Sequence, residues 1–160
     1  MKKTLRLILG DQLNSNHSWF KTTDDSVTYV LMEIRTETDY ALHHIQKIVG
    51  FFAAMQAFAL DLKQKNHQVI YFHLNDSNNL QSFDKNIRHL IEKENFTHFE
   101  YQLPDEYRLD QLLQTFCKTL SIATSVSDSE HFMSSRNETD IVTLKNKKIY
   151  NIHQVSIIAN

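Results

Sequence analysis

Five residues whose side chains could contact a ligand recur at intervals of three or four within the stretch from Glu33 to Leu62. At about 100° per residue, this spacing places them along one side of a single helix. The set combines a carboxylate, a phenol, an imidazole, an ammonium group and an aromatic ring: Glu37, Tyr40, His44, Lys47 and Phe51. A helix that only faces solvent does not need this mixture, so we interpret the set as one wall of a binding site.

A second candidate group, Gly10, Asp11, Gln12 and Leu13, comes directly after an apolar run near the N-terminus. The carboxylates of Asp11 and Glu37 could accept hydrogen bonds from ring N–H groups or hydroxyls, and aromatic side chains offer flat apolar contact. This combination suits a flavin-like or pterin-like heterocycle better than a triphosphate. We therefore expect a small-molecule site built from both groups.

Each of these residues also has a structural interpretation. Asp11 could cap the following turn, and Glu37 would lie in the first turn of a helix, where acids are favoured. His44 could be a hydrogen-bonded core histidine, and Lys47 a solvated residue whose stem covers the core edge. Composition and spacing leave both interpretations open.

Several classes of site lack their required residues. Gly10 and Gly50 are the only glycines in the chain, so there is no GxGxxG fingerprint, P-loop or GxSxG elbow. The adjacent His43 and His44 point about 100° apart and cannot share a metal as an i, i+4 pair does. Cys117 is the single cysteine, which excludes a Cys-rich zinc site or an all-thiolate cluster. We assign no catalytic residue and no metal ligand.

The composition is that of one soluble globular domain. The chain has 160 residues, 41% of them hydrophobic, and a net charge of −2, which gives no overall attraction to nucleic acid. Arg6 and Gly10 interrupt the opening apolar run, so we expect no secretory leader and a cytoplasmic location. The segment from Ile48 to Leu62 carries Gln56 and Asp61, and we expect it to be too short and polar to span a membrane.

The elements that must position the candidate residues alternate between strands and helices. Apolar, β-branched runs predict strands at Thr4–Leu9, Val27–Ile34, His67–Leu74, His98–Gln102 and Ile122–Val126. The intervening patterns predict a short helix within Asp11–Asp25, a long helix to Leu62, and helices at Leu80–Glu94 and Pro104–Leu120. This order predicts an α/β fold, a Rossmann-like, doubly wound, mostly parallel sheet of about five strands.

Thr36 and Asp39 fit a capping box, so we predict that the long helix begins there. Its predicted core face consists of Leu42, Ile45, Val49, Phe52, Ala59 and Leu62. Ligands of such folds bind beyond the carboxyl ends of the strands. There, Gly10–Leu13 and Glu33–Tyr40 should converge on one crevice. Two further polar groups, Asp105–Arg108 and Asp128–His131, are interpreted as helix starts.

Four separated blocks carry a family resemblance. They are LILGDQL at Leu7–Leu13, MEIRTETDYALHHIQKIVGFFAAMQAFA from Met32, FEYQLPDEYRLDQL from Phe99 and SEHFMSS from Ser129. Together they resemble the photolyase-related proteins of bacteria, the iron-sulphur bacterial cryptochromes and prokaryotic (6-4) photolyases. The resemblance covers about residues 3 to 136 and corresponds to the N-terminal α/β antenna domain. We therefore expect a photolyase-type antenna-binding domain at residues 1–136 and a divergent tail at 137–160, a hairpin or a frayed extension.

The resemblance implies a 6,7-dimethyl-8-ribityllumazine antenna in this domain. In full-length members it also implies FAD and a [4Fe-4S] cluster in a C-terminal helical domain that performs light-driven DNA repair. The family's antenna region matches Gly10, Asp11, Gln12, Leu13, Glu37, Tyr40, His44, Lys47 and Phe51. Because the chain stops at Asn160, we expect a family member shortened by natural truncation, by a frameshift or by design, which binds neither FAD nor the cluster. Such a chain alone should neither repair DNA nor bind it tightly.

Two other classes remain alternatives. One is a truncated Rossmann-like small-molecule-binding or protein-interaction domain without catalysis, which self-associates through the surface that would face the helical domain. The other is a receiver-type signalling domain with Asp76 as phosphate acceptor. Against the receiver, Ser127 and Asp128 stand where the required lysine should be.

Overall fold

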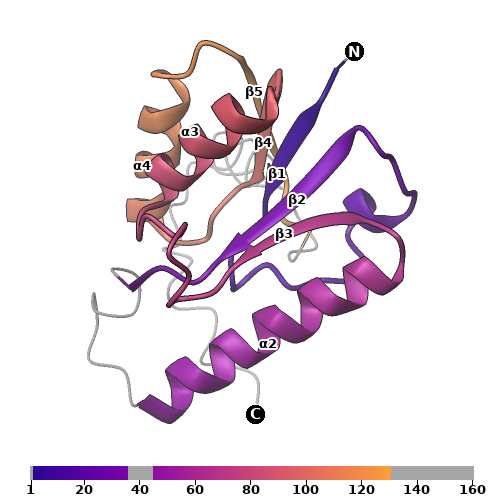
Figure 1. Cartoon of the computed structure of the whole chain (residues 1–160), viewed down its shortest axis with the longest axis vertical. Coiled ribbons are helices and arrows are strands. Elements are labelled where there is room, and N and C mark those ends of the chain that lie inside the picture. The colour runs from indigo at the N-terminus through magenta and orange to yellow at the C-terminus, as the bar shows by residue number, and fades with distance from the viewer. Residues whose placement is uncertain (1, 36–44, 131–160) are drawn as a thin grey trace, which may run out of the picture. The chain divides into compact units, whose positions relative to one another are not determined.

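Five parallel strands form the centre of the molecule, as the strand and helix order predicted. A computed structural model describes residues 2–35 and 45–130 (Figure 1). The sheet has the order β3-β2-β1-β4-β5, and every neighbouring pair is parallel. Its strands are β1 (Thr4–Leu7), β2 (Val27–Met32), β3 (Gln68–Phe72), β4 (His98–Gln102) and β5 (Ala123–Ser127). The Rossmann-like prediction is confirmed.

The strand order separates this fold from the receiver alternative. In the flavodoxin-like sheets used by receivers, the third strand lies beside the first, in the order 2-1-3-4-5. Here β1 lies between β2 and β4, with Thr4 paired to both Val27 and His98. The order is that of one Rossmann half extended by two strands, so the receiver interpretation is wrong.

The central strand is buried on both faces, which explains its nearly continuous apolar sequence. Leu5 and Leu7 have no exposed surface and belong to a core cluster on one face of the sheet. Ile8 is buried in a second cluster on the other face. The strands predicted to end at Leu9, Ile34 and Leu74 end at Leu7, Met32 and Phe72, where the chain leaves the ladder. After β1 and β2 the following side chains stay buried, whereas His73 after β3 is exposed.

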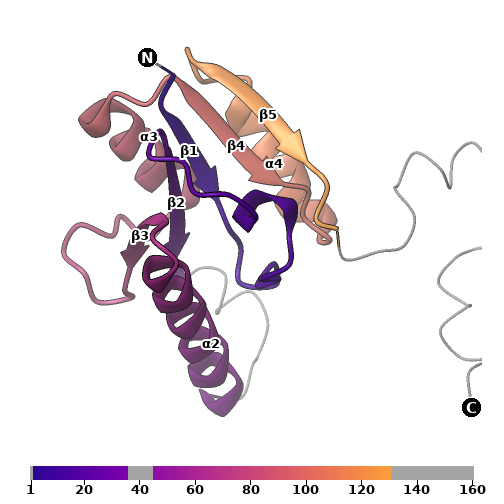
Figure 2. The ribbon, with the colours of Figure 1, turned by 90° about the vertical axis from the view of Figure 1, so that its right-hand side faces the viewer.

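Two helices cover the first face. They are α3 (Phe83–Glu94) and α4 (Tyr107–Cys117), which lie together on one side of the sheet in Figures 1 and 2. Four apolar side chains of α3 are buried in the core on this face: Phe83, Ile87, Leu90 and Ile91. Asn95 ends α3 in the left-handed conformation at φ 56°. The short helix expected between the first two strands is the 3₁₀ turn η1 (Ser18–Phe20).

The opposite face is covered by α2 (Ile45–Gln64). Its buried residues Met55, Phe58, Ala59 and Leu62 share a core cluster with Tyr29 and other residues of the sheet. The predicted helix start at Thr36, its capping partner Asp39 and the predicted core residue Leu42 lie outside the described residues.

The predicted core face of the long helix was wrong at two positions. Ile45 is 71% exposed and Val49 is 60% exposed. The first turns of α2 project beyond the sheet (Figure 2), so apolar residues there have no strand to cover. Farther along, the helix rests on the sheet through Met55 and Leu62, a face rotated away from Val49.

By length and composition alone, α2 meets the requirements of a membrane span, with a mean hydropathy of 1.3 over 18 residues. The shorter segment considered in the sequence, Ile48–Leu62, had seemed too short and too polar. A helix packed on a sheet can have the same composition, so this property does not by itself indicate a membrane.

Contacts divide the chain into one compact unit, Met1–Ser129, and a second, Glu130–Asn160. The predicted domain boundary at residue 136 and the expected hairpin or frayed tail lie outside the described residues. They remain predictions.

Candidate functional site

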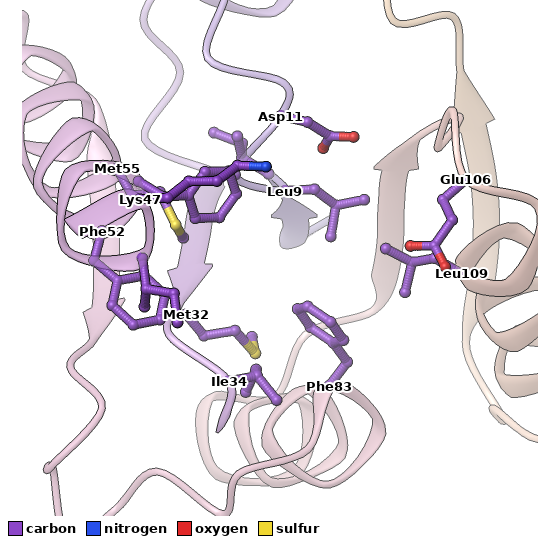
Figure 3. A pocket seen from close by; sticks show the side chains of 14 residues that line it. Leu9, Asp11, Met32, Ile34, Lys47, Phe52, Met55, Phe83, Glu106 and Leu109 are labelled. Atoms are coloured by element: carbon purple, nitrogen blue, oxygen red, sulfur yellow. The ribbon is translucent and has the colours of Figure 1, made fainter. Parts of the chain in front are cut away.

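A cavity of about 250 Å³ opens at the carboxyl ends of β1 and β2, between α2 and the starts of α3 and α4 (Figure 3). It lies where parallel α/β sheets bind their ligands. Its lining is formed by Ile8, Leu9, Gly10, Asp11, Met32, Ile34, Lys47, Ile48, Phe51, Phe52, Met55, Phe83, Glu106 and Leu109. Most of these residues come just after a strand or from the near side of α2.

The floor of the cavity is apolar. Its buried side chains come from β2, α2, α3, α4 and the segments that follow β1 and β2: Ile8, Leu9, Met32, Ile34, Met55, Phe83 and Leu109. Two of them are polarisable thioethers, which adapt to irregular shapes and contact aromatic rings favourably. A pocket of this kind suits the flat face of an aromatic ligand.

Three exposed charged residues stand among these apolar groups. Lys47 comes from α2, Asp11 follows β1, and Glu106 is the N-cap residue of α4. In Figure 3 the ends of Lys47 and Glu106 point toward the cavity from opposite walls. Glu106 Oε1 also accepts a hydrogen bond from Arg108 Nε at 2.9 Å. The arrangement offers one cation to a ligand oxygen and two carboxylates to N–H or O–H donors.

Gly10 is required by the close approach of α2. A Cβ atom placed on Gly10 would overlap the Phe51 ring and lie 2.9 Å from Met55 Sδ. Its φ is not positive, so conformational freedom is not the reason for the glycine. The missing side chain instead lets an aromatic ring rest on the backbone that follows β1.

Four of the predicted site residues, Gly10, Asp11, Lys47 and Phe51, line one cavity. The helix spacing and the position after β1 therefore predicted two segments that meet at this cavity. The predicted residues Glu37, Tyr40 and His44 lie outside the described residues, as does His43, and their role stays a prediction.

Gln12 and Leu13 were predicted with the same group but do not line the cavity. The Gln12 side chain is buried, accepts a hydrogen bond from Leu9 N at 3.1 Å and donates to Gln102 O at 3.2 Å and Leu103 O at 3.3 Å. It thus ties the loop after β1 to the end of β4. Leu13 packs against the core cluster under α2. Gln12 positions Gly10 and Asp11 from behind.

Met32, Phe83, Glu106 and Leu109 line the cavity but were not predicted as site residues. Glu106 had been interpreted as part of a helix start, and it is the N-cap of α4, but its side chain makes no capping hydrogen bond. It lines the cavity instead. Glu106 follows β4, which is the neighbour of β1 in the sheet. That position is the signal by which the sequence could have predicted Glu106 as a site residue.

A buried carboxylate lies at the end of β2, beside α2. Glu33 is 4% exposed. Its Oε1 accepts hydrogen bonds from Gln56 Nε2 at 2.8 Å and Tyr71 Oη at 2.7 Å, and its Oε2 accepts one from Leu74 N at 2.7 Å. Glu33 therefore fastens the end of β2 to α2 and to the segment following β3.

The environment of Tyr71 keeps its hydroxyl a donor. Burial first, and then the hydrogen bond to Glu33 and the charge of that carboxylate, raise the pKa of Tyr71 well above its ordinary range. The phenol stays protonated at any physiological pH. Glu33 and Tyr71 form a structural pair that supports one wall of the site.

Within residues 2–35 and 45–130, no three His, Cys, Asp or Glu side chains gather in a way that could hold a metal ion. The cavity lining there combines apolar walls with a few charged groups.

Comparisons with known proteins agree with this architecture. Residues 6–152 match the family model of deoxyribodipyrimidine photo-lyase-related proteins. The match extends past residue 136, up to which the four sequence blocks carry the resemblance. The chain is also similar to a (6-4) photolyase of Agrobacterium fabrum (strain C58 / ATCC 33970), with 30% identity over 135 residues. That alignment covers 84% of this chain and 27% of the relative. The chain thus spans about a quarter of that relative's length, and it belongs to the deoxyribodipyrimidine photo-lyase-related protein family.

Proposed function

We propose that the cavity binds a flat heterocyclic chromophore, 6,7-dimethyl-8-ribityllumazine, and that the chain serves as the light-harvesting part of a photolyase-related protein. The observation that carries this proposal is the apolar cavity with Asp11, Lys47 and Glu106 around it, at the carboxyl ends of β1 and β2. Family membership supports the same assignment.

The size of the cavity favours a small ligand. Sites for drug-sized molecules measure roughly 300–1,000 Å³. At about 250 Å³, the cavity suits a bicyclic ring and is too small for a whole dinucleotide such as FAD. A sugar-alcohol chain can extend from such a ring toward solvent past the exposed rim.

The polar groups match the edges of a lumazine. Its ring would lie against Phe51 and the apolar floor, with a carbonyl oxygen toward the Lys47 ammonium. The carboxylates of Asp11 and Glu106 would accept hydrogen bonds from a ring N–H or from ribityl hydroxyls. The expected contacts of Glu37 and Tyr40 belong to the same proposal.

The decisive experiment is a fluorescence titration of purified chain with 6,7-dimethyl-8-ribityllumazine. The wild type should bind, and Lys47→Met should bind about ten- to a hundredfold more weakly, because a hydrogen bond to a charged group contributes about 1.5–3 kcal/mol. Lys63→Met removes an exposed lysine near the other end of the same helix and should bind like the wild type.

Two results would contradict the proposal. A wild-type chain that does not bind the lumazine has no antenna role of this kind. Equal weakening by Lys47→Met and Lys63→Met would mean that the lysine in the cavity does not recognise the ligand. Glu37→Ala, made in parallel, tests the predicted carboxylate contact and should also weaken binding.

A further inference from the structure

The solvent side of α2 carries an apolar stripe that the binding site does not use. It consists of Val49, Gly50, Ala53, Ala57 and Leu60, all exposed. At about 100° per residue, these residues lie on the side of α2 opposite Met55 and Leu62, which face the sheet. We call this set the outer stripe.

The outer stripe lacks what a solvated helix face normally has. Such faces carry charged and polar residues, yet no charged residue occurs between Lys47 and Asp61. Val49 is 60% exposed and Leu60 is 57% exposed. Nothing lies within 4 Å of the position that a Cβ on Gly50 would take. The stripe is therefore an apolar ridge with a shallow gap at Gly50.

We propose that the outer stripe is the interface of a homodimer in which α2 packs antiparallel against α2 of a second copy. In an antiparallel pair centred between Ala53 and Ala57, Ala53 of each copy faces Ala57 of the partner subunit. The same register places Leu60 of each copy over Gly50 of the partner subunit. A bulky side chain thus fills each gap, and the contact is self-complementary, as a two-fold interface requires.

Charge and size support a second copy as the occupant. Because the stripe is uncharged, two copies meet without opposing like charges. Alanines at the centre let two helix backbones approach closely. Five side chains on one helix of each copy would make a small contact compared with the roughly 1,200 Å² of stable interfaces. The dimer should therefore be weak and form only as concentration rises.

Sedimentation equilibrium of the full chain, from low micromolar to millimolar concentration, tests this interface. The wild type should show a reversible monomer–dimer equilibrium. Ala53→Glu places charges at the centre of the contact and should raise the dimer dissociation constant at least tenfold. Ala54→Glu introduces the same charge about 100° around the helix and should dimerise like the wild type.

Gly50→Ala separates the interface from the stability of the helix. An alanine favours the helix and should raise the melting temperature of the dilute monomer. The added methyl group occupies the place of the incoming Leu60, so the same change should weaken the dimer severalfold. A strictly monomeric wild type, equal effects of Ala53→Glu and Ala54→Glu, or a dimer strengthened by Gly50→Ala would each overturn the proposal. So would binding of a monomeric wild type to phospholipid vesicles, which would assign the stripe to a membrane.

Discussion

At the scale of single residues, the buried carboxylate of Glu33 holds the end of β2 in place. A buried charge persists only where donors replace the water that it has lost. Glu33 receives a side-chain amide, a phenol and a backbone N–H from three different segments. Because Glu33 immediately follows β2, these bonds fix the direction in which the chain leaves the sheet.

Replacing this carboxylate tests its role. Glu33→Gln keeps the shape but turns an N–H₂ group toward groups that are themselves donors, so at least one buried bond is lost. We expect a loss of about 1–3 kcal/mol in the free energy of unfolding, measured by urea denaturation. Glu92→Gln on the exposed side of α3 should change the same quantity by less than about 0.5 kcal/mol. Equal, small effects would show that Glu33 is not a structural anchor.

The candidate site shows which residues sequence reasoning can and cannot find. Asp11 and Lys47 were predictable, because position after a strand and helix periodicity are local properties. Glu106 and Phe83 were not, because they reach the cavity only through a strand order that places β4 beside β1. Gln12 shows the opposite error. It lies in the segment after β1 that lines the cavity, but its own side chain faces the interior of the protein.

At the scale of elements, α2 explains why its core face was mispredicted. Apolar and small residues occur nearly all round this helix, so its sequence holds two apolar stripes. Periodicity identifies stripes but cannot say which one contacts the sheet or how far the sheet reaches. The central strands were predictable from their nearly continuous apolar runs, and α3 from its single apolar side.

The end of α3 offers a stabilising substitution. Asn95 adopts φ 56° while its backbone N–H bonds to Ile91 O. Glycine adopts this left-handed conformation without steric cost. Asn95→Gly should therefore raise the free energy of unfolding, by up to about 1 kcal/mol, in a thermal or urea melt.

A matched control is Asn78→Gly. Asn78 is an exposed loop residue whose φ is not positive, so glycine there only adds freedom to the unfolded chain. It should be neutral or destabilising. Stabilisation by both substitutions would point away from the conformation of Asn95 as the cause.

At the scale of the whole molecule, two histidines make stability depend on pH. Burial is the main cause that lowers the pKa of both His67 and His98 below the ordinary value of 6.5. His67 packs edge-on against Phe20 and Tyr29, and His98 shares a hydrogen bond with Ser125. The folded state therefore binds these protons less readily than the unfolded chain.

The sign of the effect follows from this difference. Above pH 6.5 both histidines are neutral in either state, and their contribution to stability is complete. As the pH falls below 6.5 the unfolded chain takes up protons first, so stability is lost. The melting temperature should drop as the pH falls from about 6.5 to about 5.5. His67→Phe should reduce that drop, and replacing the exposed His89 by Gln should not. A wild-type melting temperature that stays constant over this range would contradict the account.

The central position of β1 has a consequence for biosynthesis. β1 pairs with β2 soon after it is made, but its other partner, β4, follows 94 residues later. At about 5–20 residues per second, a ribosome leaves that edge of β1 unpaired for about 5 to 20 seconds. During this interval the nascent chain presents Leu5 and Leu7 beside a free hydrogen-bonding edge. Chaperones that shield apolar strands should engage the chain in that window and release it once His98–Gln102 has emerged and closed the centre of the sheet.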